Sequence, residues 1–141
     1  MPRATFFEIR GPRWDLALCR QVEAAYEAGE RVCVWAESEA EARRLDDLLW
    51  TFRDESFVPH DLWQGEAALD TPVAVGWRPG SPNGATCLVL ARDTAPAEVA
   101  GFARVVDFAP VDLPERLGPA RARFRTFRAA GFEVEFCKGG P

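Results

Sequence analysis

The sequence lacks the motifs by which many α/β domains hold phosphate. It contains no Gly-x-x-x-x-Gly-Lys-Ser/Thr segment, and no Gly-x-Gly-x-x-Gly segment follows a strand-like run. The loop at 80–84 contains two glycines but has neither the lysine nor the following helix that would surround a phosphate with N–H groups. These absences argue against a nucleotide site, and we expect this loop to be a simple turn connection.

The sequence also has few residues suited to metal binding or cross-linking. His60 is the single histidine, and the four cysteines form no Cys-x-x-Cys pair. We therefore expect no metal site, no cofactor and no disulfide, with the cysteines acting as small buried hydrophobic residues. No apolar run approaches the length of a membrane span and no apolar signal region follows Met1. This pattern predicts a cytoplasmic protein without a membrane partner.

Catalytic constellations are missing as well. His60 has the ordinary chemistry of a general base, but no nucleophile can be identified near it and no serine lies in a nucleophile-elbow pattern. We therefore interpret His60 as a structural or partner-facing residue and the chain as non-catalytic. A nucleotide-binding domain or enzyme on a Rossmann-like fold is the alternative, because fold alone does not determine function.

The composition is that of one ordinary globular domain spanning 1–141. Hydrophobic residues make up 48 % of the 141 residues and charged residues 28 %, without repeats or low-complexity tracts. The formal net charge of -5 argues against a protein that coats nucleic acid along its whole surface.

Strand-like and helix-like runs alternate along the chain. The strand-like runs lie at 4–9, 31–36, 72–77, 86–91, 105–108 and 132–136, and the helix-like runs at 14–28, 38–50, 96–102 and 114–130. Between them, the apolar segment 52–62 is expected to be irregular because it contains Pro59. This order predicts a three-layer α/β fold: a mostly parallel sheet with helices on both faces, similar to nucleotide-binding folds. The run 86–91 should be covered on both faces, and 132–136 should be an edge strand.

Positive charge is concentrated in the last predicted helix. Five of the 17 basic residues lie there, and no acid occurs between Glu115 and Glu133. The five are Arg116, Arg121, Arg123, Arg125 and Arg128.

One face of this helix combines an aromatic ring with guanidinium groups. Its residues recur at i, i+3, i+4 and i+7: Arg121, Phe124, Arg125 and Arg128. Ala120 and Phe127 should point toward the core. Like charges at this spacing repel, which suggests an anionic ligand, although a solubilising face is an alternative. The ligand could be nucleic acid, with phosphates on the arginines and bases on the ring, or an acidic peptide with an apolar anchor.

Five short motifs, each weak alone, occur in a specific order over nearly the whole chain. They are Thr5-Phe6-Phe7, Arg44-Leu45-Asp46 with Leu49-Trp50, Ser56-Phe57-Val58-Pro59-His60, Val105-Val106-Asp107-Phe108-Ala109-Pro110, and Arg125-x-x-Arg128-x-x-Gly131-Phe132. Together they resemble the chi subunit of bacterial DNA polymerase III holoenzyme. The resemblance implies an accessory protein of the clamp-loader complex, with a nucleotide-binding-like fold and no catalysis.

The resemblance also implies partners. A chi-like protein grips the acidic C-terminal tail of single-stranded DNA-binding protein, which ends in an apolar dipeptide and a free carboxylate. It binds the psi subunit, which joins it to the clamp loader, and an XPD-like helicase competes for that second surface. DNA would be reached indirectly.

Carried over by motif, the resemblance implies a tail-binding site on the basic helix and the strand before it. The implied residues are Ala109, Arg121, Phe124, Arg125 and Arg128. Ala109 and Phe124 would wall the apolar anchor, and Arg125 or Arg128 would pair with carboxylates. Phe124 stands where the family has Tyr, and Arg125 stands where it has Lys, which keeps the charge but changes the donor geometry.

A second surface is implied for psi or the helicase. Its residues are Trp50 and Phe57, together with Val58 and His60. Exposed aromatic residues mark interfaces, so such a role would explain the apolar loop 52–62. For Phe57, a position in the core is the open alternative.

Overall fold

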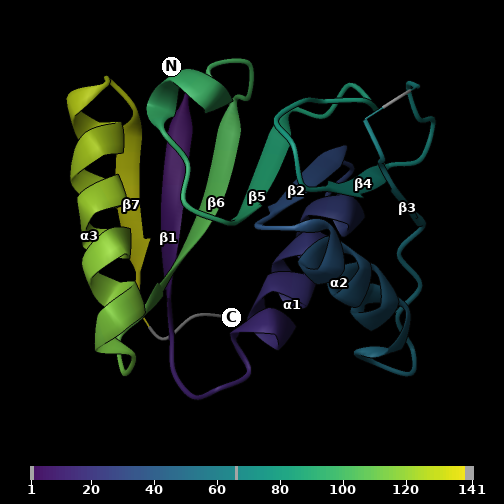
Figure 1. The fold of residues 1–141 in the computed structure, drawn as a ribbon, viewed down its shortest axis with the longest axis horizontal. Coiled ribbons are helices and arrows are strands. Elements are labelled where there is room, and N and C mark those ends of the chain that lie inside the picture. The colour runs from purple at the N-terminus through teal and green to yellow at the C-terminus, as the bar shows by residue number, and fades with distance from the viewer. Residues whose placement is uncertain (1, 66, 139–141) are drawn as a thin grey trace.

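Seven parallel strands form one sheet in the computed structural model, which describes residues 2–65 and 67–138 (Figure 1). The strand order is β3-β4-β2-β5-β6-β1-β7. The strands are β1 (Arg3–Ile9), β2 (Val32–Ala36), β3 (His60–Leu62), β4 (Val73–Gly76), β5 (Cys87–Ala91), β6 (Arg104–Pro110) and β7 (Glu133–Cys137). Every described strand pairing is parallel, so the predicted mostly parallel sheet is parallel throughout.

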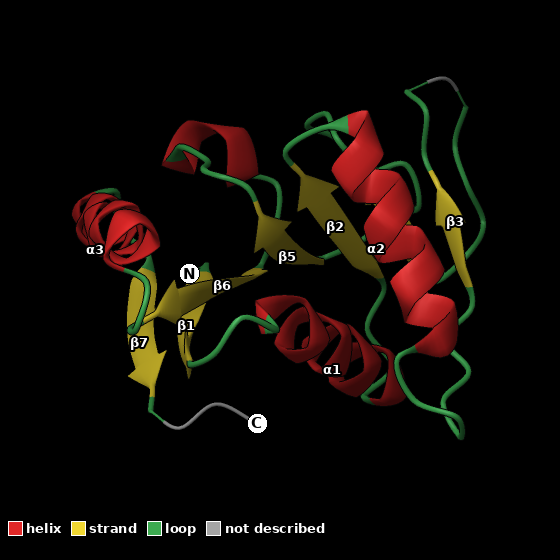
Figure 2. Ribbon diagram, turned by 60° about the horizontal axis from the view of Figure 1, so that its bottom comes forward, coloured by secondary structure: helices red, strands yellow, loops and turns green. Residues whose placement is uncertain are grey.

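Helices cover both faces of the sheet. They are α1 (Trp14–Glu27), α2 (Glu39–Thr51), the short 3-10 helix η1 (Pro96–Val99) and α3 (Pro114–Ala129). Figure 2 shows α1 on one side of the strands and α3 with η1 on the other. Residues of α1 and α2 share one buried cluster with the sheet, whereas residues of η1 and α3 share the other. The predicted three-layer α/β fold is confirmed.

The two clusters arise because side chains alternate along each strand. In β2, Val32 and Val34 pack toward α1 and α2, and Trp35 packs toward the opposite layer. All five residues of β2 are buried. The same alternation buries β5 on both faces, with Leu88 on one and Val89 on the other, as its continuous apolar run predicts.

Two local expectations are wrong. The segment after α2 contains the strand β3, because Pro59 precedes the strand and β3 needs a partner on one side only, at the edge of the sheet. The helix expected at 96–102 is reduced to the four residues of η1. The edge position expected for 132–136 is confirmed by β7, which is the last strand in the order.

The cysteines follow their expected role with one exception. Cys19, Cys33 and Cys87 are buried, and Cys137 on the edge strand is partly exposed. All four are free thiols. Within residues 2–65 and 67–138, no helix combines the length and the apolar character that crossing a membrane requires.

The strand order separates the two predicted partner surfaces. It puts β3 at one end of the sheet, next to α2, and β7 at the other end, next to α3 (Figure 1). The residues singled out around 50–60 therefore lie far from those of the basic helix.

Candidate partner-binding surfaces

The inner face of α3 packs into the core as the helical spacing predicts. Ala120 is 1 % exposed and Phe127 is fully buried. The Phe127 ring centroid lies 6.2 Å from that of Phe6 on β1 and 5.0 Å from that of Phe132. These aromatic contacts fix the rotation of α3 about its own axis, and this rotation decides which arginines face solvent.

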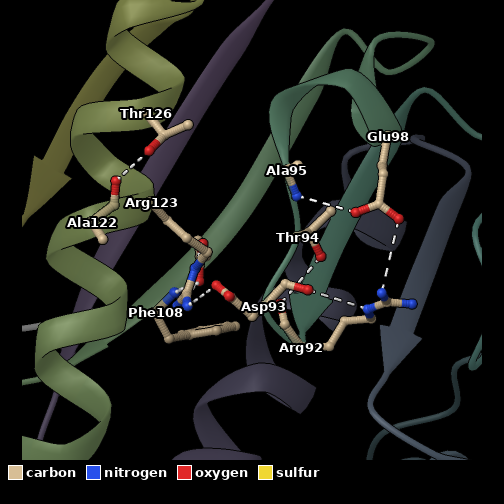
Figure 3. Close-up of polar contacts among 10 residues, drawn as sticks. Arg92, Asp93, Thr94, Ala95, Glu98, Phe108, Ala122, Arg123 and Thr126 are labelled. Atoms are coloured by element: carbon tan, nitrogen blue, oxygen red, sulfur yellow. Dashed lines mark hydrogen bonds and ion pairs between the residues drawn. The ribbon is translucent and has the colours of Figure 1, made fainter.

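Arg123 is turned inward rather than outward. Its Nε and Nη2 donate to the two carboxylate oxygens of Asp107 on β6, at 2.7 and 3.1 Å. Its Nη1 donates to Asp93, just after β5, at 2.9 Å, and Figure 3 shows the side chain pointing from α3 toward Asp93. Asp107 is 2 % exposed and also accepts the Phe108 N–H at 2.7 Å. Burial raises the pKa of Asp107, although Arg123 favours its charged form.

No pattern in the sequence predicts this pair. Arg123 and Asp107 are 16 residues apart on different elements, so helical spacing does not link them. The available signal is Asp107 itself, an acid inside the apolar strand run 105–108. A charge buried in a strand needs a partner, and the partner comes from the helix that covers that strand.

The remaining arginines of the predicted face are exposed. Arg121, Arg125 and Arg128 are all exposed, and none of them forms an ion pair with any residue in 2–65 or 67–138. The Arg128 guanidinium carbon lies 5.1 Å from the centroid of the half-buried Phe124 ring, a cation–π contact. The structure thus brings Phe124 and Arg128 together and leaves three positive charges facing solvent.

Ala109, the last residue of the predicted tail site, lies on β6. Alternation along β6 puts its side chain on the same face as Asp107, toward α3. It is only 7 % exposed, so it offers little area to a partner. The Phe124 ring packs against the buried cluster on this side of the sheet, with an aromatic contact to Phe6 on β1 and the cation–π contact to Arg128.

The second surface contains an exposed aromatic pair. Trp50 at the end of α2 is 46 % exposed, and Phe57 in the following loop is 71 % exposed. Their ring centroids lie 5.8 Å apart. Phe57 is therefore not a core residue, and the alternative left open by its sequence is resolved.

Val58 and His60 lie beneath this pair instead of beside it. They are 1 % and 4 % exposed, and the His60 ring is stacked under Trp50 with a centroid separation of 4.0 Å. The ring nitrogens of His60 lie 2.7 Å from the Val58 carbonyl oxygen and 2.8 Å from that of Asp46. Burial raises the pKa of the Asp46 carboxyl group, while the nearby His60 ring opposes this. Of the four residues predicted for this surface, Trp50 and Phe57 are exposed, whereas Val58 and His60 are buried and could only support them. The partner role of the surface stays a prediction.

An open cavity of about 290 Å³ lies at the carboxyl ends of β1, β5 and β6. Trp14 and Phe108 give it aromatic walls, and the Asp107–Arg123 pair forms part of its lining. This is the edge of a parallel sheet at which ligands commonly bind. Among the residues that the structure describes, no group of three His, Cys, Asp or Glu side chains could hold a metal ion.

These features define a small α/β domain with an exposed aromatic pair near one end of its sheet and an exposed arginine-rich helix face near the other. The comparison with known families identifies it further. The model of the family "DNA polymerase III chi subunit, HolC" matches residues 1–135, and the chain belongs to this family.

Curated relatives support the same assignment. The DNA polymerase III subunit chi of Pseudomonas aeruginosa is 34 % identical over 117 residues, which cover 83 % of this chain and 80 % of the relative. The subunit chi of Escherichia coli is 34 % identical over 119 residues, with the same coverage of both chains. That of Haemophilus influenzae is 30 % identical over 119 residues, covering 82 % of this chain and 81 % of the relative.

A solved structure shares the fold. The crystal structure of T4 UvsW matches 96 % of this chain with a TM-score of 0.68 at 10 % identity. The match covers 41 % of the UvsW chain, and at this identity it concerns the fold alone.

Proposed function

We propose that this chain is a non-catalytic accessory subunit of DNA polymerase III holoenzyme in cytoplasmic DNA replication. It links the clamp loader, through psi, to single-stranded DNA-binding protein, and it reaches DNA through that protein. The observation that carries the proposal is the exposed face of α3, which combines three arginines without an ion-pair partner among the described residues with a half-buried phenylalanine in contact with one of them. Membership of the chi family supports this role.

The chemistry of the α3 face fits an acidic tail that ends in apolar residues. Arg121, Arg125 and Arg128 supply planar guanidinium groups, which pair with carboxylates through two parallel hydrogen bonds. Phe124 supplies an apolar contact for the end of the tail, and Arg128 above its ring is positioned for the terminal carboxylate. Each charge-assisted hydrogen bond contributes about 1.5–3 kcal/mol.

We assign the second surface to psi or, in competition with it, to an XPD-like helicase. Trp50 and Phe57 offer two adjacent exposed rings, the residue types that dominate protein interfaces. Because His60 is stacked beneath Trp50 and is held between two carbonyl oxygens, the Trp50 ring is presented in a fixed orientation. Little conformational entropy of the Trp50 side chain is therefore lost when a partner binds.

The test is binding of a labelled peptide with the C-terminal sequence of the organism's single-stranded DNA-binding protein, measured by fluorescence anisotropy. Arg128→Ala should weaken binding by about 10- to 100-fold, the equivalent of one charge-assisted contact. Phe124→Ala should weaken it as well. Arg20→Ala, which removes an exposed arginine from α1, is the matched control and should bind like the parent. If Arg128→Ala and Phe124→Ala both bind like the parent, the assigned site is wrong.

A gel-shift measurement distinguishes direct contact with DNA from contact through single-stranded DNA-binding protein. The parent protein should retard single-stranded DNA only when single-stranded DNA-binding protein is also present. Retardation by this protein alone would replace the bridging role with direct binding, which would then fall steeply with added salt.

A nucleotide-binding or enzymatic role is the second candidate, and the cavity at the carboxyl ends of β1, β5 and β6 is the observation that favours it. A thermal-shift screen against nucleotides tests it. A ligand-specific rise in melting temperature that disappears in Trp14→Ala would support this role.

A further inference from the structure

A third exposed aromatic residue lies outside both the α3 face and the Trp50–Phe57 pair. Among the described residues, the exposed large hydrophobic side chains are Trp50, Phe57 and Phe136, and Phe136 on β7 is 46 % exposed. β7 is the end strand of the sheet and pairs with β1 only. An aromatic ring in this position is unusual, because edge strands more often present charged residues to solvent.

The register of β7 places Phe136 beside the aromatic contacts of α3. Phe136 is the register partner of Phe6 on β1, so both side chains point to the same face of the sheet. That face is the one that α3 covers, because the Phe6 ring centroid lies 5.3 Å from that of Phe124. Val134, two residues earlier on β7, packs into the same layer. Phe6 therefore lies between two partly exposed rings, and we call Phe124, Phe6 and Phe136 the aromatic row.

The charges around the aromatic row have one sign on the α3 side. Arg128 lies over Phe124, and Arg121 and Arg125 belong to the same helix face. The acids of β7, Glu133 and Glu135, alternate with Phe136 and point to the opposite face of the sheet. The position of Glu135 agrees with this, since its carboxylate accepts the Thr5 hydroxyl at 3.1 Å.

We propose that Phe136 is a specificity-determining residue of the tail site, which contacts the apolar C-terminal side chains of the acidic peptide opposite Phe124. This inference rests on the proposed function of the α3 face. It extends the apolar contact from α3 to β7, across the buried Phe6. The occupant follows from charge complementarity: carboxylates lie on the arginines, and the uncharged end of the peptide lies on the aromatic row.

A peptide fits this surface better than a nucleic acid strand. A strand carries a phosphate at every nucleotide, including those beyond the reach of the three arginines. In an acidic tail, the charged residues precede the apolar C-terminal residues, so the two kinds of side chain can bind different parts of this surface. Stacking of nucleic acid bases on the aromatic row is the alternative, and the experiment includes it as an outcome.

The experiment compares two peptides on matched variants. One peptide keeps the natural apolar C-terminal residue and the other ends in alanine, both with the acidic segment and free carboxylate. Phe136→Ala should weaken binding of the natural peptide about tenfold, the loss typical of an aromatic contact at an interface. It should change binding of the alanine-ended peptide less than about twofold, because the contact that it removes is already missing.

Two controls keep the result interpretable. Trp77→Ala removes a partly exposed aromatic ring just after β4, outside both surfaces, and should leave both affinities unchanged. Phe136→Leu retains an apolar side chain and should preserve most of the discrimination between the peptides. Melting temperatures of all variants report whether each is folded.

The outcomes separate this inference from the proposed function. If the parent binds the natural peptide and Arg128→Ala weakens it, but Phe136→Ala loses nothing or weakens both peptides equally, the role of Phe136 is wrong and the α3 site stands. If the parent binds neither peptide, the proposed function fails and this inference fails with it. Weakening of single-stranded DNA binding by Phe136→Ala, without an effect on either peptide, would also overturn the inference.

Discussion

Helices α2 and α3 use their arginines in different ways. In α2, Arg43 pairs with Glu39 one turn earlier at 2.8 Å. Arg44 pairs with Glu41 and with Asp15 of α1. In α3, Arg123 forms ion pairs with Asp93 and Asp107. The arginines of the outer face, at 121, 125 and 128, form none with the residues that the structure describes.

This difference teaches that the arginines with partners inside the fold are not the ones proposed for binding. The arginines of α2 and the inward Arg123 have their partners within the fold, so their removal should be seen in unfolding experiments. The outer arginines of α3 repel one another at i, i+3 and i+4 spacing, which slightly disfavours the free protein. A ligand that neutralises them relieves this repulsion.

The largest expected effect comes from Arg123→Ala. Removing it leaves the Asp107 carboxylate, 2 % exposed, without its bidentate partner, and breaking a buried ion pair costs about 3–5 kcal/mol. Urea unfolding at pH 7 measures the loss. Arg121→Ala on the same helix is the control and should change the free energy of unfolding by less than about 0.5 kcal/mol. Equal effects of the two changes would remove the distinction between inward and outward arginines.

The second-largest effect is expected for Arg44→Ala. The Arg44 side chain joins α2 to α1 through Asp15, and the substitution removes this link. It should cost about 1 kcal/mol at pH 7, the upper range for a partly exposed pair, because the Asp15 side chain is only 9 % exposed. Burial raises the pKa of Asp15, but the hydrogen bonds from Arg44 and Arg13 outweigh this and lower the pKa.

The lowered pKa of Asp15 also fixes the pH dependence of this effect. A carboxyl group with a lowered folded-state pKa stabilises the fold above its unfolded pKa, near 3.8, and this contribution is lost as the pH falls through the folded-state value. The difference between parent and Arg44→Ala should therefore shrink from pH 6 to pH 3. A difference that stays constant across this range would show that Arg44 acts through packing and not through Asp15.

A smaller effect is expected for Arg43→Ala. Both partners of the Arg43–Glu39 pair are about half exposed, and such i,i+4 pairs contribute about 0.3–0.5 kcal/mol. Added salt should abolish the difference from the parent, since water and ions screen exposed charges. Thermal unfolding at low and high ionic strength measures it.

The smallest effect on stability is expected when the outer arginines of α3 are all replaced by alanine. The triple variant at Arg121, Arg125 and Arg128 should unfold within about 0.5 kcal/mol of the parent, with a tendency toward higher stability as the repulsion is removed. Circular dichroism during thermal unfolding measures it, while the same variant should lose the tail peptide. A large loss of stability would mean that these arginines serve the fold after all.

Much of the fold follows from local patterns in the sequence. The continuous apolar runs predicted β2 and β5, and the helical spacing of Ala120 and Phe127 predicted the buried face of α3. β3 was missed because three residues after a proline carry no strand pattern of their own. They form a strand only because β4 offers them a parallel partner.

The sites were less accessible to prediction than the fold. The helix face of α3 is a local property, so its exposed arginines and Phe124 could be grouped from their spacing. The pairing of Arg123 with Asp107 depends on which strand α3 covers, and the burial of Val58 and His60 depends on how the loop folds under Trp50. The position of Phe136 beside Phe6 depends on the register of β7 against β1, which no local pattern in the sequence predicts.

The strand order has a mechanical consequence for the proposed linking role. The Trp50–Phe57 pair lies next to β3, through the stacking of Trp50 on His60, and the aromatic row ends on β7. Six inter-strand steps of about 4.8 Å separate these strands, or roughly 29 Å in all. In the proposed role, proteins bound at the two ends would be kept near one another by the sheet between them. The width of the sheet would then set the local concentration of one partner at the other, as the length of a flexible linker does in tandem-domain proteins.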